Sequence, residues 1–202
     1  GGSSSVTSTD GADSLSVTGS LSASYLQGNA GNDTFNVTSS VASGSSVRGG
    51  ADSDFISIAG TVTSSFVSGD LGADTILVTA GLNNSSLYGG SLTDTTGDSA
   101  DSLMVNGAIT ASFLQGNAGN DTFNLAGAVT NNSSVRGGAN DDKIIISAGG
   151  VSSSFVSGDL GSDTISSAAL VLQSSIYGGS IQDTTGDSAD SISLTAGVNQ
   201  SF

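Results

Sequence analysis

Apolar and polar positions alternate in short runs that recur about every 20 residues along the chain. In each unit a serine and an aliphatic residue precede a glycine at two-residue intervals, as in Ser45, Val47 and Gly49. Residues two apart share one face of a β-strand, so the pattern predicts a strand that points both side chains into a core. The aliphatic residues of this column are Leu26, Val47, Val67, Leu87, Leu114, Val135, Val156 and Ile176.

A second short strand is predicted after the glycine turn. Most units place two apolar residues there, two positions apart, from Phe35 and Val37 to Ile144 and Ile146, whereas Ile165 is followed by Ser167. A lone aliphatic residue then recurs in the connection to the next unit, at Val41, Val62, Leu82, Ile109, Val129, Val151, Val171 and Val198. Short strands and glycine-rich turns at this period are typical of solenoids. We therefore expect an all-β fold, a right-handed parallel β-solenoid similar to a β-roll, with about 20–21 residues per coil, about nine coils and two main sheets.

A longer repeat is superimposed on the coils. Residues 23–36 recur almost unchanged at 111–124, an offset of 88, and residues 69–76 recur at 158–165, an offset of 89. We predict one continuous solenoid over 1–202, a fragment of a longer array, with long repeats at 23–110 and 111–199 and the end of a preceding repeat at 1–22.

The amino-acid composition argues against several classes of function. The net charge is −15, all 18 acidic residues are Asp, and only three residues are basic, which argues against a nucleic-acid partner. No apolar run approaches 18 residues, so we expect no membrane insertion. Because His, Cys and Glu are absent, the usual general bases and activated nucleophiles are missing, and we expect no enzymatic activity.

The acidic residues concentrate in the turns between the two predicted strands. Six turns, such as Gly69-Asp-Leu-Gly-Ala-Asp74, end in an Asp that is followed by one residue and then a large apolar one. The closing residues are Asp33, Asp54, Asp74, Asp121, Asp142 and Asp163, and Asp13, Asp101 and Asp190 precede an apolar residue in the same way. Stacked carboxylates repel one another unless a cation lies between them, and Ca²⁺ takes six to eight oxygen ligands.

These turns resemble the nonapeptide G-G-x-G-x-D-x-U-x of the RTX (haemolysin-type calcium-binding) repeat family. Residues 28–36, 69–77, 116–124 and 158–166 match every position but the second glycine. The resemblance implies that several Ca²⁺ ions are bound by the closing Asp residues and by turn carbonyls. Only one edge of each coil matches, so we expect one calcium column rather than the two of a usual RTX roll.

Two insertions add further candidate calcium ligands. The first groups Asp94, Asp98 and Asp101, and the second repeats them at Asp183, Asp187 and Asp190. Such a group could form a separate local site, and the sequence leaves open whether Asp94 or Asp101 joins the main column.

A row of aromatic residues lies on the predicted outer face, at Tyr25, Phe66, Phe113, Phe155 and Phe202. The row is either an exposed stripe for association or a set of rings tucked under neighbouring coils.

The RTX resemblance implies an extracellular or cell-surface protein secreted by a type I system, of the giant surface-protein kind found in marine bacteria and cyanobacteria. We expect a calcium-stabilised structural rod of a filament, a surface layer (S-layer) or a giant surface protein, self-associating end to end or laterally. The alternatives are an adhesin that binds a glycan, a cell or ice through the outer face, and the calcium-binding tail of a secreted hydrolase.

Overall fold

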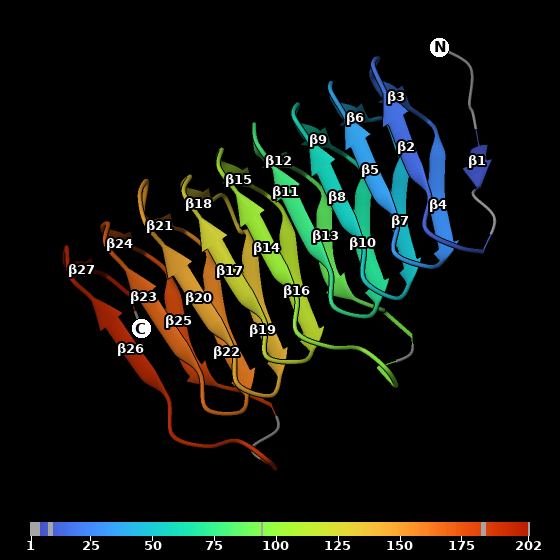
Figure 1. Ribbon diagram of the computed structural model, residues 1–202. Coiled ribbons are helices and arrows are strands. Elements are labelled where there is room, and N and C mark those ends of the chain that lie inside the picture. Colours follow the sequence, from blue (N-terminus) through green and yellow to red (C-terminus); the bar gives the residue numbers. More distant parts are fainter. Residues whose placement is uncertain (1–4, 8–9, 94, 183–184, 202) are drawn as a thin grey trace.

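The computed structural model describes residues 5–7, 10–93, 95–182 and 185–201 and shows an all-β parallel solenoid of about eight turns (Figure 1). Its strands form three parallel sheets, and each sheet takes one strand from every coil. Sheet A contains β1 (Ser5–Thr7), β4 (Tyr25–Ala30), β7 (Ser46–Ala51), β10 (Phe66–Leu71), β13 (Ser86–Gly90), β16 (Phe113–Ala118), β19 (Ser134–Ala139), β22 (Phe155–Leu160) and β25 (Ser175–Gly179).

Sheets B and C follow in each coil. Sheet B contains β2 (Ser14–Val17), β5 (Thr34–Val37), β8 (Phe55–Ile58), β11 (Thr75–Val78), β14 (Ser102–Val105), β17 (Thr122–Leu125), β20 (Lys143–Ile146), β23 (Thr164–Ser167) and β26 (Ser191–Leu194). Sheet C contains β3 (Leu21–Ser22), β6 (Val41–Ala42), β9 (Val62–Thr63), β12 (Leu82–Asn83), β15 (Ile109–Thr110), β18 (Val129–Thr130), β21 (Val151–Ser152), β24 (Val171–Leu172) and β27 (Val198–Asn199).

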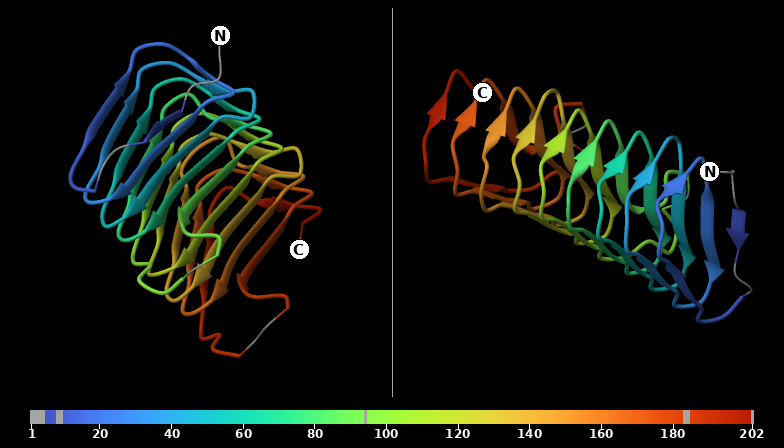
Figure 2. Two further views of the ribbon diagram at one scale, coloured as in Figure 1. Left: turned by 90° about the vertical axis from the view of Figure 1, so that its right-hand side faces the viewer. Right: turned by 90° about the horizontal axis from the view of Figure 1, so that it is seen from above.

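The expectation of two main sheets is wrong, because the segment predicted as a connection is itself a strand of sheet C. Backbone N–H groups near a core must find acceptors, and the neighbouring coil supplies them. Val41 N–H donates to the Thr61 carbonyl, and Val62 N–H donates to the Gly81 carbonyl, both at 3.0 Å. Stacking the coils in register thus converts two extended residues per coil into a third sheet (Figure 2).

The predicted inward columns form the core. Register pairs like with like, for example Ile76 with Leu103 in sheet B and Leu82 with Ile109 in sheet C. The aliphatic residues of these columns in the inner coils are buried. Ser167, which interrupts one column, is buried too, and its hydroxyl donates to the Ala169 carbonyl at 2.9 Å. Each coil therefore buries its apolar side chains mainly against the coils on either side.

The inward serine column forms hydrogen bonds along the solenoid at the corner between sheets C and A. Ser65 N–H donates to Ser85 Oγ at 3.2 Å, and Ser65 Oγ donates to the Thr63 carbonyl at 2.9 Å. Equivalent bonds join Ser45 to Ser65 and Ser85 to Ser112. The small side chain thus satisfies a buried N–H and fixes where each sheet A strand begins.

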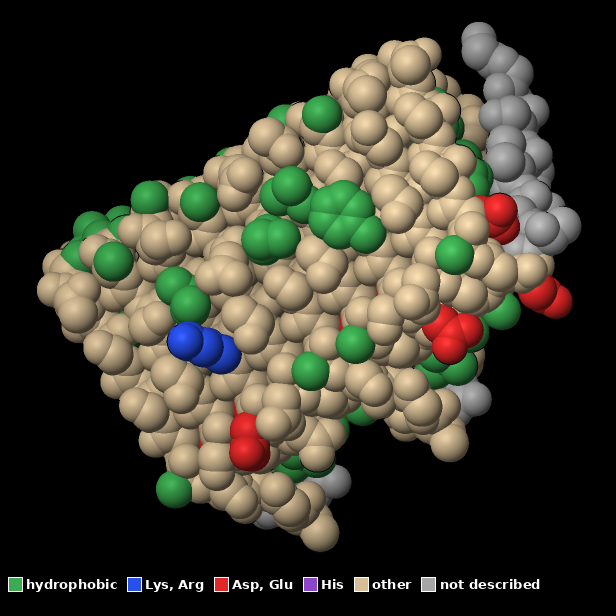
Figure 3. Space-filling view, viewed as in Figure 1, with side chains coloured by type: hydrophobic (Ala, Val, Ile, Leu, Met, Phe, Trp, Pro, Cys, Tyr) green, Lys and Arg blue, Asp and Glu red, His purple; other side chains and the backbone are tan. Residues whose placement is uncertain are grey.

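The outer face of sheet B is mainly uncharged, with separate small apolar groups (Figure 3). The described residues of the two insertions, within 91–93, 95–101, 180–182 and 185–190, project from the edge where sheet A turns into sheet B (Figure 1).

Candidate cation site along the aspartate ladder

The six-residue turn between sheets A and B places its closing Asp toward the interior. Its second and fourth residues adopt left-handed conformations, as at Asp70 (φ 79°) and Gly72 (φ 125°). Asn, Asp and Gly tolerate this region best, which explains their use in the turn. Asp74 ends the turn immediately before β11, and its side chain is buried at the edge of the core.

The closing carboxylates form one continuous ladder. From Asp33 onward, the Oδ1 atom of each accepts the backbone N–H of the ladder Asp in the preceding coil: Asp54 N–H donates to Asp74, and Asp74 N–H donates to Asp101, both at 2.7 Å. All eight such bonds measure 2.7–2.9 Å. The ladder consists of Asp13, Asp33, Asp54, Asp74, Asp101, Asp121, Asp142, Asp163 and Asp190.

The second carboxylate oxygen, Oδ2, is buried and lacks a hydrogen-bond partner in eight of these residues. They are Asp13, Asp33, Asp54, Asp74, Asp101, Asp121, Asp142 and Asp163. A buried oxygen without a partner costs free energy, more so when it carries charge. A row of such oxygens along one line is therefore unfavourable unless protons or bound cations neutralise their negative charge.

The glycine that opens each turn makes room for this oxygen. A Cβ added to Gly69 would lie 2.2 Å from Asp74 Oδ2 and 2.5 Å from the Gly89 carbonyl oxygen of the next coil. The same crowding by the coil's ladder Asp occurs at Gly28, Gly49, Gly89, Gly116, Gly137, Gly158 and Gly178. A carboxylate oxygen and, in most coils, a carbonyl oxygen thus face the same small space beside each of these glycines.

Burial raises the pKa of the seven ladder carboxyls from Asp33 to Asp163. Loss of hydration is the largest cause, neighbouring ladder carboxylates raise the pKa further, and the backbone N–H bond opposes both. The pKa of Asp54, Asp74 and Asp121 rises to about 7, and that of Asp101 and Asp142 to about 9. Near neutral pH the folded ladder therefore favours protons or another cation over free negative charge.

The ladder offers hard oxygen atoms, which could bind ions such as Ca²⁺ or Mg²⁺. Within the described ranges, no three acidic side chains converge as a metal-binding group. Most positions would contribute one free carboxylate oxygen and the adjacent backbone carbonyl, as Asp74 and Gly89 do. The remaining ligands of an ion would have to be further carbonyls or water.

The structure decides which insertion carboxylate joins the ladder. Asp101 and Asp190 occupy ladder positions, and the other predicted ligands Asp94 and Asp183 lie outside the described residues. The predicted separate local site, which would include Asp94, thus lies partly outside the described residues.

Asp98 lies beside the ladder and anchors the insertion to the following coil. Its Oδ2 accepts Ala118 N–H at 3.2 Å and its Oδ1 accepts Ser99 N–H at 3.1 Å. Burial is the main reason that its pKa rises to about 6. Asp187, the equivalent residue of the second insertion, packs against Gly179, and its Oδ1 accepts Ser188 N–H at 3.0 Å.

Two ion pairs on the outer face of sheet A escaped sequence reasoning. Arg48 Nη2 lies 3.2 Å from Asp70 Oδ1, and Arg136 Nη1 lies 3.1 Å from Asp159 Oδ1. In the sequence, the feature that could have predicted these ion pairs is the separation of 22–23 residues between Arg and Asp, which corresponds to about one coil.

No family model matches the chain, and neither a curated protein nor a solved structure matches it. The RTX resemblance of the turns thus stays a prediction. No helix in the described part of the chain is long and apolar enough to cross a membrane.

Proposed function

We propose that this chain is a structural rod whose aspartate ladder binds several Ca²⁺ ions in one column. The observation that carries the proposal is the line of buried, unpartnered Oδ2 atoms, of which those from Asp33 to Asp163 each lie beside a turn glycine. A divalent cation between successive coils would neutralise this charge and cross-link the turns. Calcium suits the site because it accepts carboxylate and carbonyl oxygens in flexible geometry. The metal ligands in this proposal are the ladder Asp residues, as the RTX-like turns suggest.

Binding of calcium and folding would be coupled, because the ladder exists only when coils are stacked. We include an extracellular location in the proposal, because calcium dissociation constants of about 10⁻⁴–10⁻³ M are typical of extracellular modules. Right-handed coiling belongs to it too, since crossovers between parallel strands are right-handed in nearly all proteins.

The rod role is supported by how the coils contact one another. Each sheet takes one strand from every coil, so a strand pairs only with the equivalent strands of the coils on either side. A stack of this kind can be extended by further coils of the same pattern, including those of a second copy. We therefore include end-to-end self-association, and a structural rather than a catalytic role, in the proposal.

An isosteric substitution in the ladder tests the calcium site. Asp74→Asn keeps an acceptor for Asp54 N–H, removes the buried charge and places an N–H₂ group near the Gly89 carbonyl. In excess chelator we expect the variant to melt higher than wild type, on the order of 3 °C, which corresponds to about 1 kcal/mol in a chain of this length. Added CaCl₂ should stabilise wild type more than the variant, as measured by circular dichroism.

The control is Asp10→Asn, which removes the same charge from an exposed position. It should leave both the calcium response and the melting temperature in chelator close to those of wild type. A wild-type melting temperature that is the same in calcium and in chelator would refute the calcium column.

A further inference from the structure

A groove runs lengthwise along the solenoid where sheet C meets the beginning of the sheet A strands. It consists of three hollows in line, of about 320 Å³ at Phe66, 230 Å³ at Phe113 and 350 Å³ at Phe155. Asn84 and Ser86 line both the first and the second hollow, and adjoining residues continue the groove into the third. The groove lies at the opposite end of the sheet A strands from the aspartate ladder.

The groove presents an aromatic ring in every second coil. In the register of sheet A, Phe66 pairs with Ser86, Ser86 with Phe113, Phe113 with Ser134, and Ser134 with Phe155. Since neighbouring strands lie about 4.8 Å apart, the rings repeat about every 9.6 Å along the axis. Small serines separate the rings and leave the hollows open.

Side chains nearer to the turn between sheets A and B contact the rings and hold them in place. The Arg136 guanidinium lies 4.7 Å from the centroid of Phe155, and Arg136 Nη1 donates to both carboxylate oxygens of Asp159, at 3.1 and 3.3 Å. Tyr88 lies 5.5 Å from both Phe66 and Phe113, centroid to centroid. The three phenylalanines are half-buried, which answers the question left by the sequence: they are neither fully exposed nor covered. Side chains fixed in this way lose little entropy when a ligand binds.

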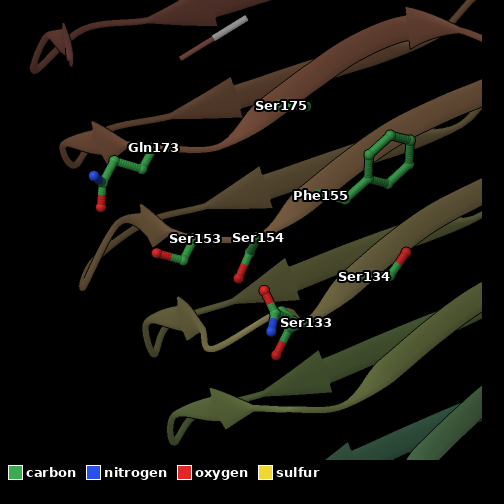
Figure 4. A pocket seen from close by; sticks show the side chains of 8 residues that line it. Ser133, Ser134, Ser153, Ser154, Phe155, Gln173 and Ser175 are labelled. Atoms are coloured by element: carbon green, nitrogen blue, oxygen red, sulfur yellow. The ribbon is translucent and has the colours of Figure 1, made fainter. Parts of the chain in front are cut away.

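The remaining lining of the groove is polar and uncharged. It consists of serine, asparagine and glutamine side chains with one glycine and one alanine, and none of the Asp residues that the structure describes takes part. Figure 4 shows hydroxyl groups of several serines and the amide of Gln173 lining the hollow that Phe155 also lines. Asn84, Asn132 and Gln173 are exposed. In a chain of net charge −15, a groove free of charged groups suits a neutral ligand with many hydroxyls.

We propose that this groove binds a neutral, unbranched β-1,4-linked polysaccharide lying along the solenoid axis. Such a chain is an extended ribbon in which every second sugar presents the same apolar face, at a repeat close to that of two coils. Alternate sugars would pack on Phe66, Phe113 and Phe155, and the hydroxyls at the edges would bond to the Asn, Gln and Ser side chains. The site requires the folded solenoid but no ion in the ladder, and it adds a binding activity to the structural role.

The test is calorimetric titration of the folded chain, in calcium, with cellohexaose as the probe. Cellobiose tests the dependence on length, and maltohexaose, whose α-1,4 linkages curve the chain, tests the dependence on shape. We expect cellohexaose to bind more tightly than cellobiose and maltohexaose. Phe113→Ala and Phe155→Ala should each weaken cellohexaose binding roughly tenfold, the value of one aromatic contact.

The matched control is Phe55→Ala, which removes a 40% exposed ring from the outer face of sheet B, outside the groove. It should bind cellohexaose as wild type does, and circular dichroism must show that all variants keep the β spectrum. Phe155→Leu keeps an apolar side chain but not the ring, and should also weaken binding.

Three outcomes would overturn the proposal. They are no cellohexaose binding at millimolar concentration, equal losses for Phe55→Ala and Phe113→Ala, and equal binding of cellohexaose and maltohexaose. Lateral dimers in sedimentation velocity that Phe113→Ala abolishes, without glycan binding, would assign the groove to a second copy instead.

Discussion

At the residue scale, a ladder Asp of an inner coil uses one carboxylate oxygen for a structural hydrogen bond and leaves the other without a partner. Oδ1 accepts a backbone N–H from the adjoining coil, as Asp142 does from Asp121 at 2.8 Å, and Oδ2 is left buried and unpartnered. The N–H bond favours the ionised form, but burial disfavours it more strongly. The same side chain therefore stabilises the stacking of coils and makes it depend on a neutralising cation.

The metal-free chain should be most stable in mild acid. Because the folded pKa of the ladder carboxyls from Asp33 to Asp163 lies above the unfolded value of 3.8, reaching about 7 at Asp74 and about 9 at Asp101, the folded state binds protons more tightly. Below about pH 4 both states are protonated and carry no penalty. Stability should then fall as the pH rises from about 4 to 9, as followed by melting temperature in chelator.

Two comparisons test whether the ladder carboxyls cause this loss of stability with rising pH. Saturating calcium should flatten the decline, and the double variant Asp101→Asn with Asp142→Asn should remove its upper part, because these two carboxyls have the highest pKa values. A melting temperature in chelator that rises from pH 5 to pH 9 would contradict the assignment.

At the element scale, the turn depends on space as much as on backbone conformation. Gly69 does not adopt a positive φ, so conformation alone does not require glycine there. The requirement comes from the Asp74 carboxylate and the Gly89 carbonyl, which occupy the place of a side chain. Sheet C shows the same dependence on neighbours, because its two-residue strands are paired only through the adjacent coils.

Gly69→Ala should lower the free energy of unfolding by about 1–3 kcal/mol, the usual range for overpacking. The matched control is Gly19→Ala, where an added Cβ meets no atom within 4 Å, and stability should not fall. Urea unfolding measures both. Adding Asp74→Ser to Gly69→Ala should recover part of the loss, because the oxygen nearest the new methyl group is then removed. No loss in Gly69→Ala would show that the turn relaxes and that the glycine is not required by space.

At the scale of the whole molecule, the solenoid is a linear stack in which each coil contacts mainly its neighbours. Nine strands per sheet span roughly 40 Å at the usual strand spacing. Stability in such stacks depends on interfaces between adjacent repeats. The ladder adds a repulsive term to every interface, and a cation would convert it into an attractive one.

Calcium should therefore control the length of the assembly. In millimolar calcium we expect sedimentation velocity and negative-stain electron microscopy to show rods longer than one chain, joined end to end. Chelator should return them to single chains or unfold them, whereas Mg²⁺ at the same concentration should be less effective, because it demands a stricter geometry. Single short particles at all calcium concentrations would refute end-to-end association.

Much of the fold could be predicted from the sequence because the pattern is local and repeated. The inward positions of Val47 and Val67 follow from two-residue alternation, and their stacking follows from the 20-residue period. The third sheet could not be predicted in this way. A two-residue strand such as Leu82–Asn83 has no periodicity of its own, and it becomes a strand only when the next coil pairs with it.

The closing Asp of each turn was likewise visible in the sequence, but the separate roles of its two carboxylate oxygens were not. The sequence by itself determined the coil period, the inward columns and the position of one carboxylate per coil, because these depend on neighbours along the chain. Only the tertiary structure decided that Oδ1 would be bonded and Oδ2 left free, that Asp101 would take the ladder position, and that Phe113 and Phe155 would line one groove. These features join atoms about one coil or more apart in sequence, so they arise only when the coils are stacked.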